Sequence, residues 1–262
     1  MTAKTWRLGR LFGPDGRTVI LPVDHGLPLG EVSGLEDPID LLSSFRAVPL
    51  DGVLMSYGLG LRTVPLFASR NAPARVLTAD NFLEDAASGL QYDMLIRPSL
   101  AIREGYDAMK VIMFWDQPAS NRMQMMRLIA ELVAETHQLE MPIMIEPTYL
   151  HTPLSDRALG DAVRLSFELG ADIIKIPFPD SMETLTRWIR SYPIPFVMLG
   201  GSQVKSFQET IDAVKLAVNV GARGVVMGRN IWQRPRDEAL EMMGHIWEIV
   251  HPTLAQGGQT WR

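Results

Sequence analysis

The 262-residue chain contains no cysteine, and this absence excludes disulfide bonds, thiolate nucleophiles and thiolate metal ligands. No stretch approaches the roughly 18 apolar residues that a membrane span requires. The first ten residues, MTAKTWRLGR, also lack the apolar segment of a secretory signal. These absences predict a cytoplasmic protein with no membrane partner.

The chain has fewer basic residues (25 lysine and arginine) than acidic ones (30 aspartate and glutamate). Its net charge is −5, and no basic stripe offsets the acidic balance, so we expect no nucleic-acid partner. No G-x-G-x-x-G pattern follows the first predicted strand, which gives the dinucleotide-binding fold no support. The apolar fraction of 47% and the charged fraction of 21% are those of an ordinary globular protein with a sizeable core.

Eight short apolar runs follow one another along the chain. Each is bounded by glycine, proline or polar residues, and most are nearly continuous, as is typical of strands in a buried parallel sheet. The predicted strands are residues 18–25, 51–58, 74–82, 108–116, 141–147, 171–179, 194–201 and 222–230.

Segments with helical periodicity lie between these runs, at 120–138, 154–170, 202–221 and 234–252. Ser120 or Asn121 is expected to cap the first of them, and glycines end the second and third. Eight alternating strand and helix units favour a closed (β/α)₈ TIM barrel over an open sheet, as one domain over residues 1–262.

Residues 83–107 do not fit a simple strand–helix unit. They are expected to hold a loop and a helix near residues 99–106. Arg97 and Arg103 lie in this segment, and they could either recognise a second anionic group of a ligand or remain solvated surface charges.

The carboxyl ends of the predicted strands are unusually polar, and the active site of a TIM barrel lies at that end. Carboxylates suited to proton transfer end the first and fifth strands, at Asp24 and Glu146. Tyr149 or His151 could donate a proton, and His25 could be structural or could hydrogen-bond a substrate. A metal site built from His25, His151 and carboxylates is a weaker alternative because the histidines lack a ligand spacing.

The stretch GADIIKIPFPD, residues 170–180, places Lys175 in an apolar strand, where an unpaired charge is costly. Strand alternation puts Ile173 and Lys175 on one face, so Lys175 points into the barrel if Ile174 and Ile176 pack on helices. The flanking isoleucines and Phe178 are expected to keep the amine poorly solvated. Lys175 could then be a nucleophile, or it could form a buried ion pair with Glu146 or Asp24 that only stabilises the barrel.

A second lysine, Lys110, lies on the fourth predicted strand and could reach the same cavity. A neighbouring cation favours the neutral, nucleophilic form of an amine. Lys110 is therefore expected either to activate Lys175 in this way or to hold a substrate oxygen.

Glycines end the seventh and eighth strands, where this fold often binds phosphate through backbone N–H groups. The predicted phosphate-binding residues are Gly200, Gly201, Ser202, Gly228 and Arg229. The alternative is that the glycines only permit tight turns and that Arg229 points outward to a salt bridge.

Over nearly its whole length, the chain resembles the class I (Schiff-base) aldolases of the superfamily of deoxyribose-phosphate, archaeal-type fructose-bisphosphate and tagatose-bisphosphate aldolases. VDHG is similar to the first-strand signature, and GADIIKIPF is similar to the strand that carries the Schiff-base lysine. LGGSQVKS and GARGVVMGRNIWQ are similar to the paired phosphate-binding segments, and the second is the most specific match.

The chain departs from the archaeal-type branch at the end of the fifth strand, where Thr148 stands in place of a catalytic tyrosine. Glu146, with Lys110 on the fourth strand, is more similar to the tagatose-bisphosphate and sulfofructose-phosphate aldolases. The sequence thus mixes two branches, and the sugar and its stereochemistry stay open.

The resemblance implies reversible aldol cleavage of a phosphorylated ketose or related sugar phosphate, with Lys175 as the covalent residue and no other cofactor or metal. It also implies Glu146, then Asp24, as the base, and a homo-oligomer. Three alternatives remain: a transaldolase-like or thiolase-like transferase on the same lysine, a metal-dependent aldolase, and a non-catalytic phosphosugar-binding protein.

Overall fold

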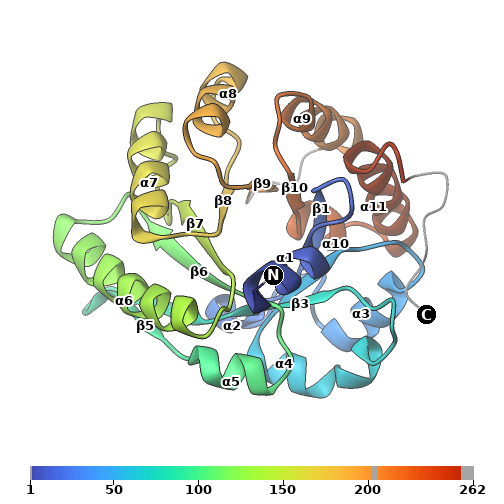
Figure 1. Cartoon of the computed structure of the whole chain (residues 1–262), viewed down its shortest axis with the longest axis horizontal. Coiled ribbons are helices and arrows are strands. Elements are labelled where there is room, and N and C mark those ends of the chain that lie inside the picture. The colour runs from blue at the N-terminus through green and yellow to red at the C-terminus, as the bar shows by residue number, and fades with distance from the viewer. Residues whose placement is uncertain (1, 202–205, 255–262) are drawn as a thin grey trace.

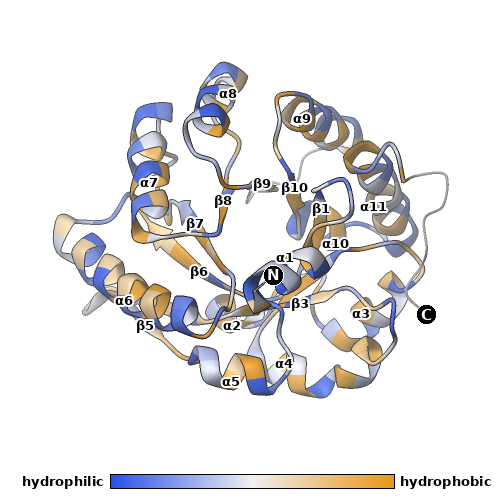
Figure 2. Cartoon of the chain, viewed as in Figure 1, coloured by the Kyte–Doolittle hydropathy of each residue, from blue (hydrophilic) through white to orange (hydrophobic). Residues whose placement is uncertain are grey.

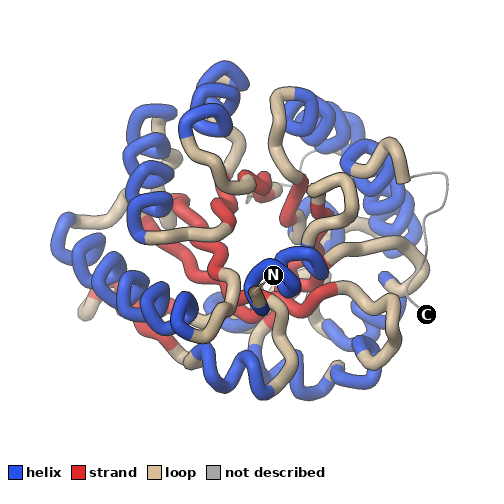
Figure 3. Tube along the Cα trace, viewed as in Figure 1, coloured by secondary structure: helices blue, strands red, loops and turns tan. Residues whose placement is uncertain are grey.

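A computed structural model describes residues 2–201 and 206–254, and its centre is a closed barrel of eight parallel strands (Figure 3). The order around the barrel is β1-β10-β9-β8-β7-β6-β3-β2. The barrel strands are β1 (Thr18–Pro22), β2 (Gly52–Met55), β3 (Ala74–Thr78), β6 (Ala108–Phe114), β7 (Ile143–Thr148), β8 (Ile173–Ile176), β9 (Phe196–Leu199) and β10 (Gly224–Val226).

Helices surround the barrel (Figure 1). They are α1 (Ala3–Leu11), α2 (Gly26–Leu29), α3 (Pro38–Phe45), α4 (Tyr57–Arg62), the 3₁₀ helix η1 (Val64–Phe67), α5 (Pro98–Arg103), α6 (Ala119–Gln138), α7 (Asp156–Leu169), α8 (Met182–Ser191), α9 (Phe207–Asn219), α10 (Arg229–Trp232) and α11 (Arg236–Val250). The predicted TIM barrel is therefore confirmed, and each of its eight strands lies within or beside its predicted run.

The N-cap predicted for α6, Ser120 or Asn121, is wrong. The helix begins after Pro118, whose carbonyl oxygen accepts the N–H of Arg122. Ser120 and Asn121 therefore already lie within the first turn, and neither side chain can act as the N-cap. Ser155 caps α7, and Gly170 ends that helix in the left-handed conformation, as predicted.

Two apolar layers hold the barrel together. Alternate strand residues such as Met144 and Ile173 fill its interior, where Leu8, Leu11 and Phe12 of the α1 region pack on them. Helix α1 lies across the barrel opening that faces the viewer in Figure 1. The other strand faces pack on the apolar sides of the helices (Figure 2). The interior is thus closed at the amino ends of the strands.

Three aspartates stand one residue before β2, β6 and β8, and each accepts a backbone N–H from a neighbouring strand. The pairs are Asp51 with Val19 at 2.6 Å, Asp107 with Arg75 at 3.0 Å and Asp172 with Ile143 at 3.0 Å. Each aspartate also bonds a cationic or titratable side chain, His251, Arg10 and Lys4 respectively. We call these three residues the amino-end aspartates.

The third predicted strand, 74–82, is in fact two strands, and the loop expected after it is partly a hairpin. Strand β4 (Asp80–Asp85) leaves the barrel and pairs antiparallel with β5 (Gly89–Met94). The turn is built by the Asp85 carboxylate, which accepts the N–H groups of Ala87 and Ser88, and by Gly89 at a φ of 65°. Helix α5 confirms the helix expected near 99–106, shifted toward the amino terminus.

Candidate active site

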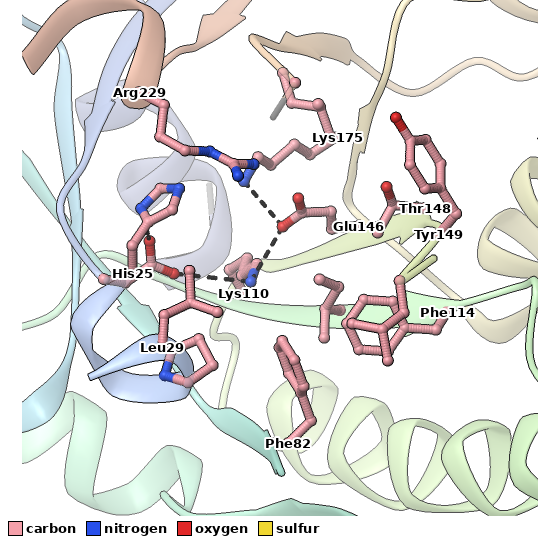
Figure 4. Close-up of a pocket in the computed structure, with 16 residues that line it drawn as sticks. His25, Leu29, Phe82, Lys110, Phe114, Glu146, Thr148, Tyr149, Lys175 and Arg229 are labelled. Carbon is pink, nitrogen blue, oxygen red and sulfur yellow. Dashed lines mark hydrogen bonds and ion pairs between the residues drawn. The ribbon is translucent and has the colours of Figure 1, made fainter. Parts of the chain in front are cut away.

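A cavity of about 240 Å³ opens at the carboxyl ends of the barrel strands (Figure 4). It brings together many of the residues predicted from the sequence: Asp24, His25, Lys110, Glu146, Thr148, Tyr149, Lys175, Gly201 and Arg229. The remaining lining is apolar: Pro28, Leu29, Phe82, Ile112, Phe114, Leu150 and Leu199.

Strand alternation delivers the charged side chains to this cavity. Lys175 comes two residues after Ile173, whose side chain fills the barrel interior, and Glu146 comes two residues after Met144, which does the same. The intervening Ile174 packs in the outer layer between the strands and the helices. Lys175 therefore points inward, as predicted, and it is only 5% exposed.

The expected reason for the poor solvation of Lys175 is wrong in part. Ile174, Ile176 and Phe178 all belong to the outer apolar layer, and none of them lines the cavity. Because alternation turns them away from the amine, the barrel interior itself buries Lys175.

The four buried charges form a chain in which the signs alternate. Lys175 Nζ donates to Glu146 Oε2 at 2.9 Å, and Lys110 Nζ lies 3.1 Å from the same oxygen. Lys110 Nζ also lies 3.8 Å from Asp24 Oδ2, which accepts a 2.6 Å hydrogen bond from Thr78. The predicted ion pair between Lys175 and Glu146 therefore exists, within a cavity that a ligand can enter.

The surroundings of Lys110 and Glu146 keep both of them ionised. Burial alone lowers the pKa of Lys110, but the carboxylates of Glu146, Asp24 and Asp80 outweigh it, so the pKa is raised. Burial likewise opposes ionisation of Glu146, but the two lysine ammonium groups outweigh it and lower the pKa of this carboxyl. At neutral pH the cavity therefore holds the Lys110 ammonium and the ionised Glu146 carboxylate.

Asp24 and His25 titrate far from neutral pH. Despite burial, the ammonium of Lys110, with His25, Lys175 and the Thr78 hydroxyl, lowers the pKa of Asp24 to about 2. Burial, reinforced by the charges of Lys175 and Arg229, lowers the pKa of His25 to about 4. His25 is therefore neutral at pH 7, and its buried Nδ1 makes no hydrogen bond within the described part of the chain.

The loops after β9 and β10 place glycine backbone and one arginine at the cavity. Gly201 lines it at a φ of 80°, with open space where a side chain would start. Gly228 precedes Arg229 where the chain is tightly packed: a Cβ there would lie 2.9 Å from Trp232 Nε1 and 3.0 Å from the Pro22 carbonyl oxygen, so these neighbours would have to shift. Gly200 accepts a 2.7 Å hydrogen bond from Asn230, which joins the two loops. Ser202 lies outside the described residues.

Arg229 points into the cavity toward Lys175 in Figure 4, and it forms no ion pair with any described residue. The outward salt bridge considered for it is therefore absent from the described chain. Its Nε is buried and has no hydrogen-bond partner there, so the guanidinium can receive an anion.

Other candidates do not join the site. His151 is more than half exposed and bonds Glu84 of the hairpin. Arg97 and Arg103 are 83% and 72% exposed and pair with Glu135 and Glu104. Among residues 2–201 and 206–254 no group of three histidine, aspartate or glutamate side chains could hold a metal ion. Within the same ranges no helix is long and apolar enough to cross a membrane.

Sequence reasoning missed Thr78 and the apolar wall of the cavity. Thr78 follows Val76 on the inward face of β3, so alternation could have found it. Phe82 could not be found in this way because it comes from the unrecognised hairpin, where its ring packs edge-on against Phe114 at 4.7 Å.

Comparisons with known proteins identify the family and the fold. Residues 18–234 match the sequence model of the DeoC/LacD family aldolase. The chain is 28% identical to a 2-amino-3,7-dideoxy-D-threo-hept-6-ulosonate synthase of Halobacterium salinarum, over 95% of this chain and 91% of that protein. It is equally identical to a 3-hydroxy-5-phosphonooxypentane-2,4-dione thiolase of Yersinia pseudotuberculosis, over 94% and 81%.

A solved structure shares the fold. It is an archaeal fructose-1,6-bisphosphate aldolase whose catalytic lysine is covalently bound to the carbinolamine intermediate of its substrate. The TM-score is 0.79 at 21% identity, and the match covers 95% of this chain and 99% of the other.

Proposed function

Given that the chain belongs to the DeoC/LacD aldolase family, we propose that it cleaves and forms a carbon–carbon bond of a phosphorylated ketose or related sugar phosphate through a Schiff base on Lys175. The observation that carries the proposal is the buried amine of Lys175, held 2.9 Å from the Glu146 carboxylate inside the cavity. A nucleophile next to a base within hydrogen-bond reach is the arrangement that covalent catalysis needs. The archaeal aldolase of the same fold forms its intermediate on a lysine.

The surroundings of the two lysines favour Lys175 over Lys110 as the nucleophile. Lys110 lies near two carboxylates, at 3.1 and 3.8 Å, and its raised pKa keeps it protonated. Lys175 has one carboxylate partner, Glu146, at 2.9 Å. Lys110 then serves as the fixed cation that holds Glu146, or a substrate oxygen, in place.

The reaction in the cleavage direction proceeds in balanced steps. The Lys175 amine adds to the substrate ketone to give a carbinolamine, which loses water to form an iminium ion. Glu146, with Asp24 as the second candidate, removes the proton of the β-hydroxyl group, the carbon–carbon bond breaks, and an aldehyde leaves. The electron pair of the broken carbon–carbon bond moves into the iminium group and gives an enamine. The enamine is then protonated at carbon to give a new iminium ion, and water hydrolyses this ion to release the ketone and the free Lys175 amine.

The anionic end of the substrate is held by Arg229 and by backbone N–H groups at Gly201, with Gly200, Ser202 and Gly228 completing the predicted loops. Binding at this remote group orients the carbonyl against Lys175. His25, which is neutral at pH 7, and Tyr149 line the same cavity and are positioned to hydrogen-bond substrate oxygens. One barrel domain, residues 1–262, would carry all these functions, and a cytoplasmic homo-oligomer is the form that the motif resemblance favours.

Reduction with sodium borohydride in the presence of a ketose phosphate, followed by peptide mass spectrometry, tests the proposal. We expect an adduct on Lys175 in the wild-type protein and in Lys110→Met, and none in Lys175→Met. An adduct on Lys110, or full activity of Lys175→Met, would contradict the mechanism.

Group transfer is the second candidate function, because the two relatives are a synthase and a thiolase. The same enamine or iminium could pass its carbon skeleton to an acceptor other than the cleaved aldehyde. Product analysis with and without a second acceptor separates the two: simple cleavage gives the same products in both, whereas a transferase turns over only with the acceptor.

A further inference from the structure

The cavity has two chemically different sides. Among the cations that line it, Lys175 and Arg229 lie in the upper half of Figure 4, and Lys110 lies near the middle, beside Glu146. Leu29, Phe82 and Phe114 occupy the lower half of the same view, beyond Lys110 and Glu146. Ile112 and Leu150 also line the cavity, and they pack with Phe82 against the buried cluster that contains Phe114. We call these five side chains the apolar wall.

The side chains of the apolar wall are held in place by packing and hydrogen bonds. Phe82 packs edge-on against Phe114 at 4.7 Å. Phe114 belongs to a buried cluster, with Leu90, Tyr92 and Met125, that joins the hairpin to β6 and α6, and Phe82 packs against this cluster. The hairpin is also anchored by Asp80, which accepts hydrogen bonds from Tyr92 at 2.8 Å and from the N–H of Ile112 at 2.6 Å.

No second anion site is present on this side within the described residues. Lys110 and Lys175 already share the Glu146 carboxylate, which leaves Arg229 as the cation that lines the cavity without an ion-pair partner. Arg97 and Arg103 lie at the surface in pairs of their own. A second phosphate, sulfonate or carboxylate placed against the apolar wall would lose water without gaining a partner, which is costly.

We propose that this enzyme takes a substrate with one anionic end, bound at Arg229, and an uncharged, apolar opposite end, bound at the apolar wall, with Phe82 as the main specificity residue. This rests on the proposed function for the position of the reacting carbonyl at Lys175. The aldehyde released by cleavage, or the acceptor joined in synthesis, is then an alkyl or aryl compound and carries no phosphate.

Binding measurements with unreactive probes test the proposal apart from catalysis. Isothermal titration calorimetry of the whole chain would compare n-butyl phosphate, n-hexyl phosphate and 1,6-hexanediol bisphosphate. We expect affinity to rise about fourfold for each added methylene group of the monophosphates. We also expect the bisphosphate to bind more weakly than n-hexyl phosphate.

Substitutions in β4 test whether the dependence of affinity on chain length comes from Phe82. Phe82→Ala should lower n-hexyl phosphate affinity about tenfold and flatten the chain-length dependence. Phe82→Arg should make the bisphosphate the tighter ligand. Leu83→Ala is the matched control, because Leu83 is the next residue of β4, is 64% exposed and does not line the cavity, and it should change neither affinity.

Failure of the inference and failure of the proposed function look different. If the bisphosphate binds more tightly than n-hexyl phosphate to the wild type, or if no alkyl phosphate binds, the inference is overturned even when borohydride traps an adduct on Lys175. If alkyl phosphates bind with the expected chain-length dependence and no adduct forms on Lys175, the Schiff-base function fails and the two-sided cavity stands.

Discussion

The two ends of the barrel both hold buried or half-buried charges, yet the charges are arranged differently. At the amino ends of the strands, each of the amino-end aspartates is bonded both to a backbone N–H and to a side chain, and α1 supplies two of these side chains, Lys4 and Arg10. At the carboxyl ends, Lys175 and Glu146 share a pair that faces a cavity of about 240 Å³. The same kind of interaction therefore supports the fold at one end and is open to a ligand at the other.

The difference shows why a buried ion pair is by itself poor evidence of function. Lys4 and Asp172 lie 2.9 Å apart, as do Lys175 and Glu146. What distinguishes the second pair is the neighbouring space and the second lysine on the same carboxylate. Substitutions made in parallel at the two ends should separate chemistry from stability.

The largest expected effect is that of Lys175→Met, which removes the amine that we propose forms the imine. We expect kcat to fall about 10⁴-fold, as for the loss of a covalent nucleophile, with a normal far-ultraviolet circular dichroism spectrum. Lys4→Met is the matched change at the other end, and it should keep kcat within about twofold. Equal losses of activity in the two variants would contradict a special role for Lys175.

Glu146→Gln keeps the shape of the side chain but removes the base. We expect a fall in kcat of about 10²–10³-fold, the usual size for the loss of a general base. Asp172→Asn is its counterpart at the closed end, and it should lower the free energy of unfolding by about 1 kcal/mol and leave kcat nearly unchanged. Urea titration and initial-rate assays of both variants measure the two effects, and a kcat loss confined to Asp172→Asn would reverse the assignment.

The two ends of β10 offer a smaller contrast. Arg229 follows its carboxyl end in the cavity, whereas Arg223 precedes its amino end and is exposed. Arg229→Met should raise KM for a phosphorylated substrate about tenfold to a hundredfold, the value of one charged hydrogen bond. Arg223→Met should leave KM unchanged, and a similar rise in both variants would show that Arg229 acts only through overall charge.

The smallest expected effect is a change of stability with pH that comes from His251, at the amino ends of the strands. His251 is fully buried between Asp15 and Asp51, each at 2.9 Å. Burial lowers its pKa, but the two carboxylates outweigh burial and raise it. Because the pKa of His251 is higher in the folded protein than in the unfolded chain, its protonation stabilises the fold. This stabilisation is fully present below the pKa of the unfolded chain, about 6.5, and is lost as the pH rises through the pKa of the folded protein.

The stability difference between wild type and His251→Gln should therefore shrink as pH rises from 6 to 9, from a starting value of about 1–3 kcal/mol. Asp24, at the open end, has the opposite sign. Its lowered pKa contributes stability above about pH 3.8 that is lost as pH falls toward 2. A His251→Gln difference that grows with pH would contradict the charged pair.

Much of the barrel and its charged cluster could be predicted from the sequence because buried parallel strands leave a strong local signal. Continuous apolar runs located the strands, and alternation with period two gave the inward direction of Lys175. Glu146 and Asp24 were both predicted as possible partners of Lys175, but the choice of Glu146 by both lysines could not be predicted, because it depends on how three strands are placed side by side.

The hairpin and helix α1 were beyond local reasoning for a different reason. Strand β4 carries charges at its tip and exposes Leu83, so it has no apolar alternation to reveal a strand. Helix α1 buries only Leu11 completely, and its role depends on the barrel opening that it covers. Both elements are defined by tertiary contacts, and so the apolar wall that includes Phe82 was invisible in the sequence.

The amino-end aspartates have a consequence for the opposite rim. Moving one strand along its neighbour by a single residue would exchange its two faces and turn Lys175 toward the helices. By bonding Arg75 and Ile143 on adjacent strands, Asp107 and Asp172 fix the stagger that brings Lys110, Glu146 and Lys175 to one level. None of the amino-end aspartates lines the cavity, yet Asp107 and Asp172 fix the register of the strands that carry Lys110, Glu146 and Lys175. Loops at the rim can therefore diverge to suit new substrates while the far end keeps the reacting groups in line.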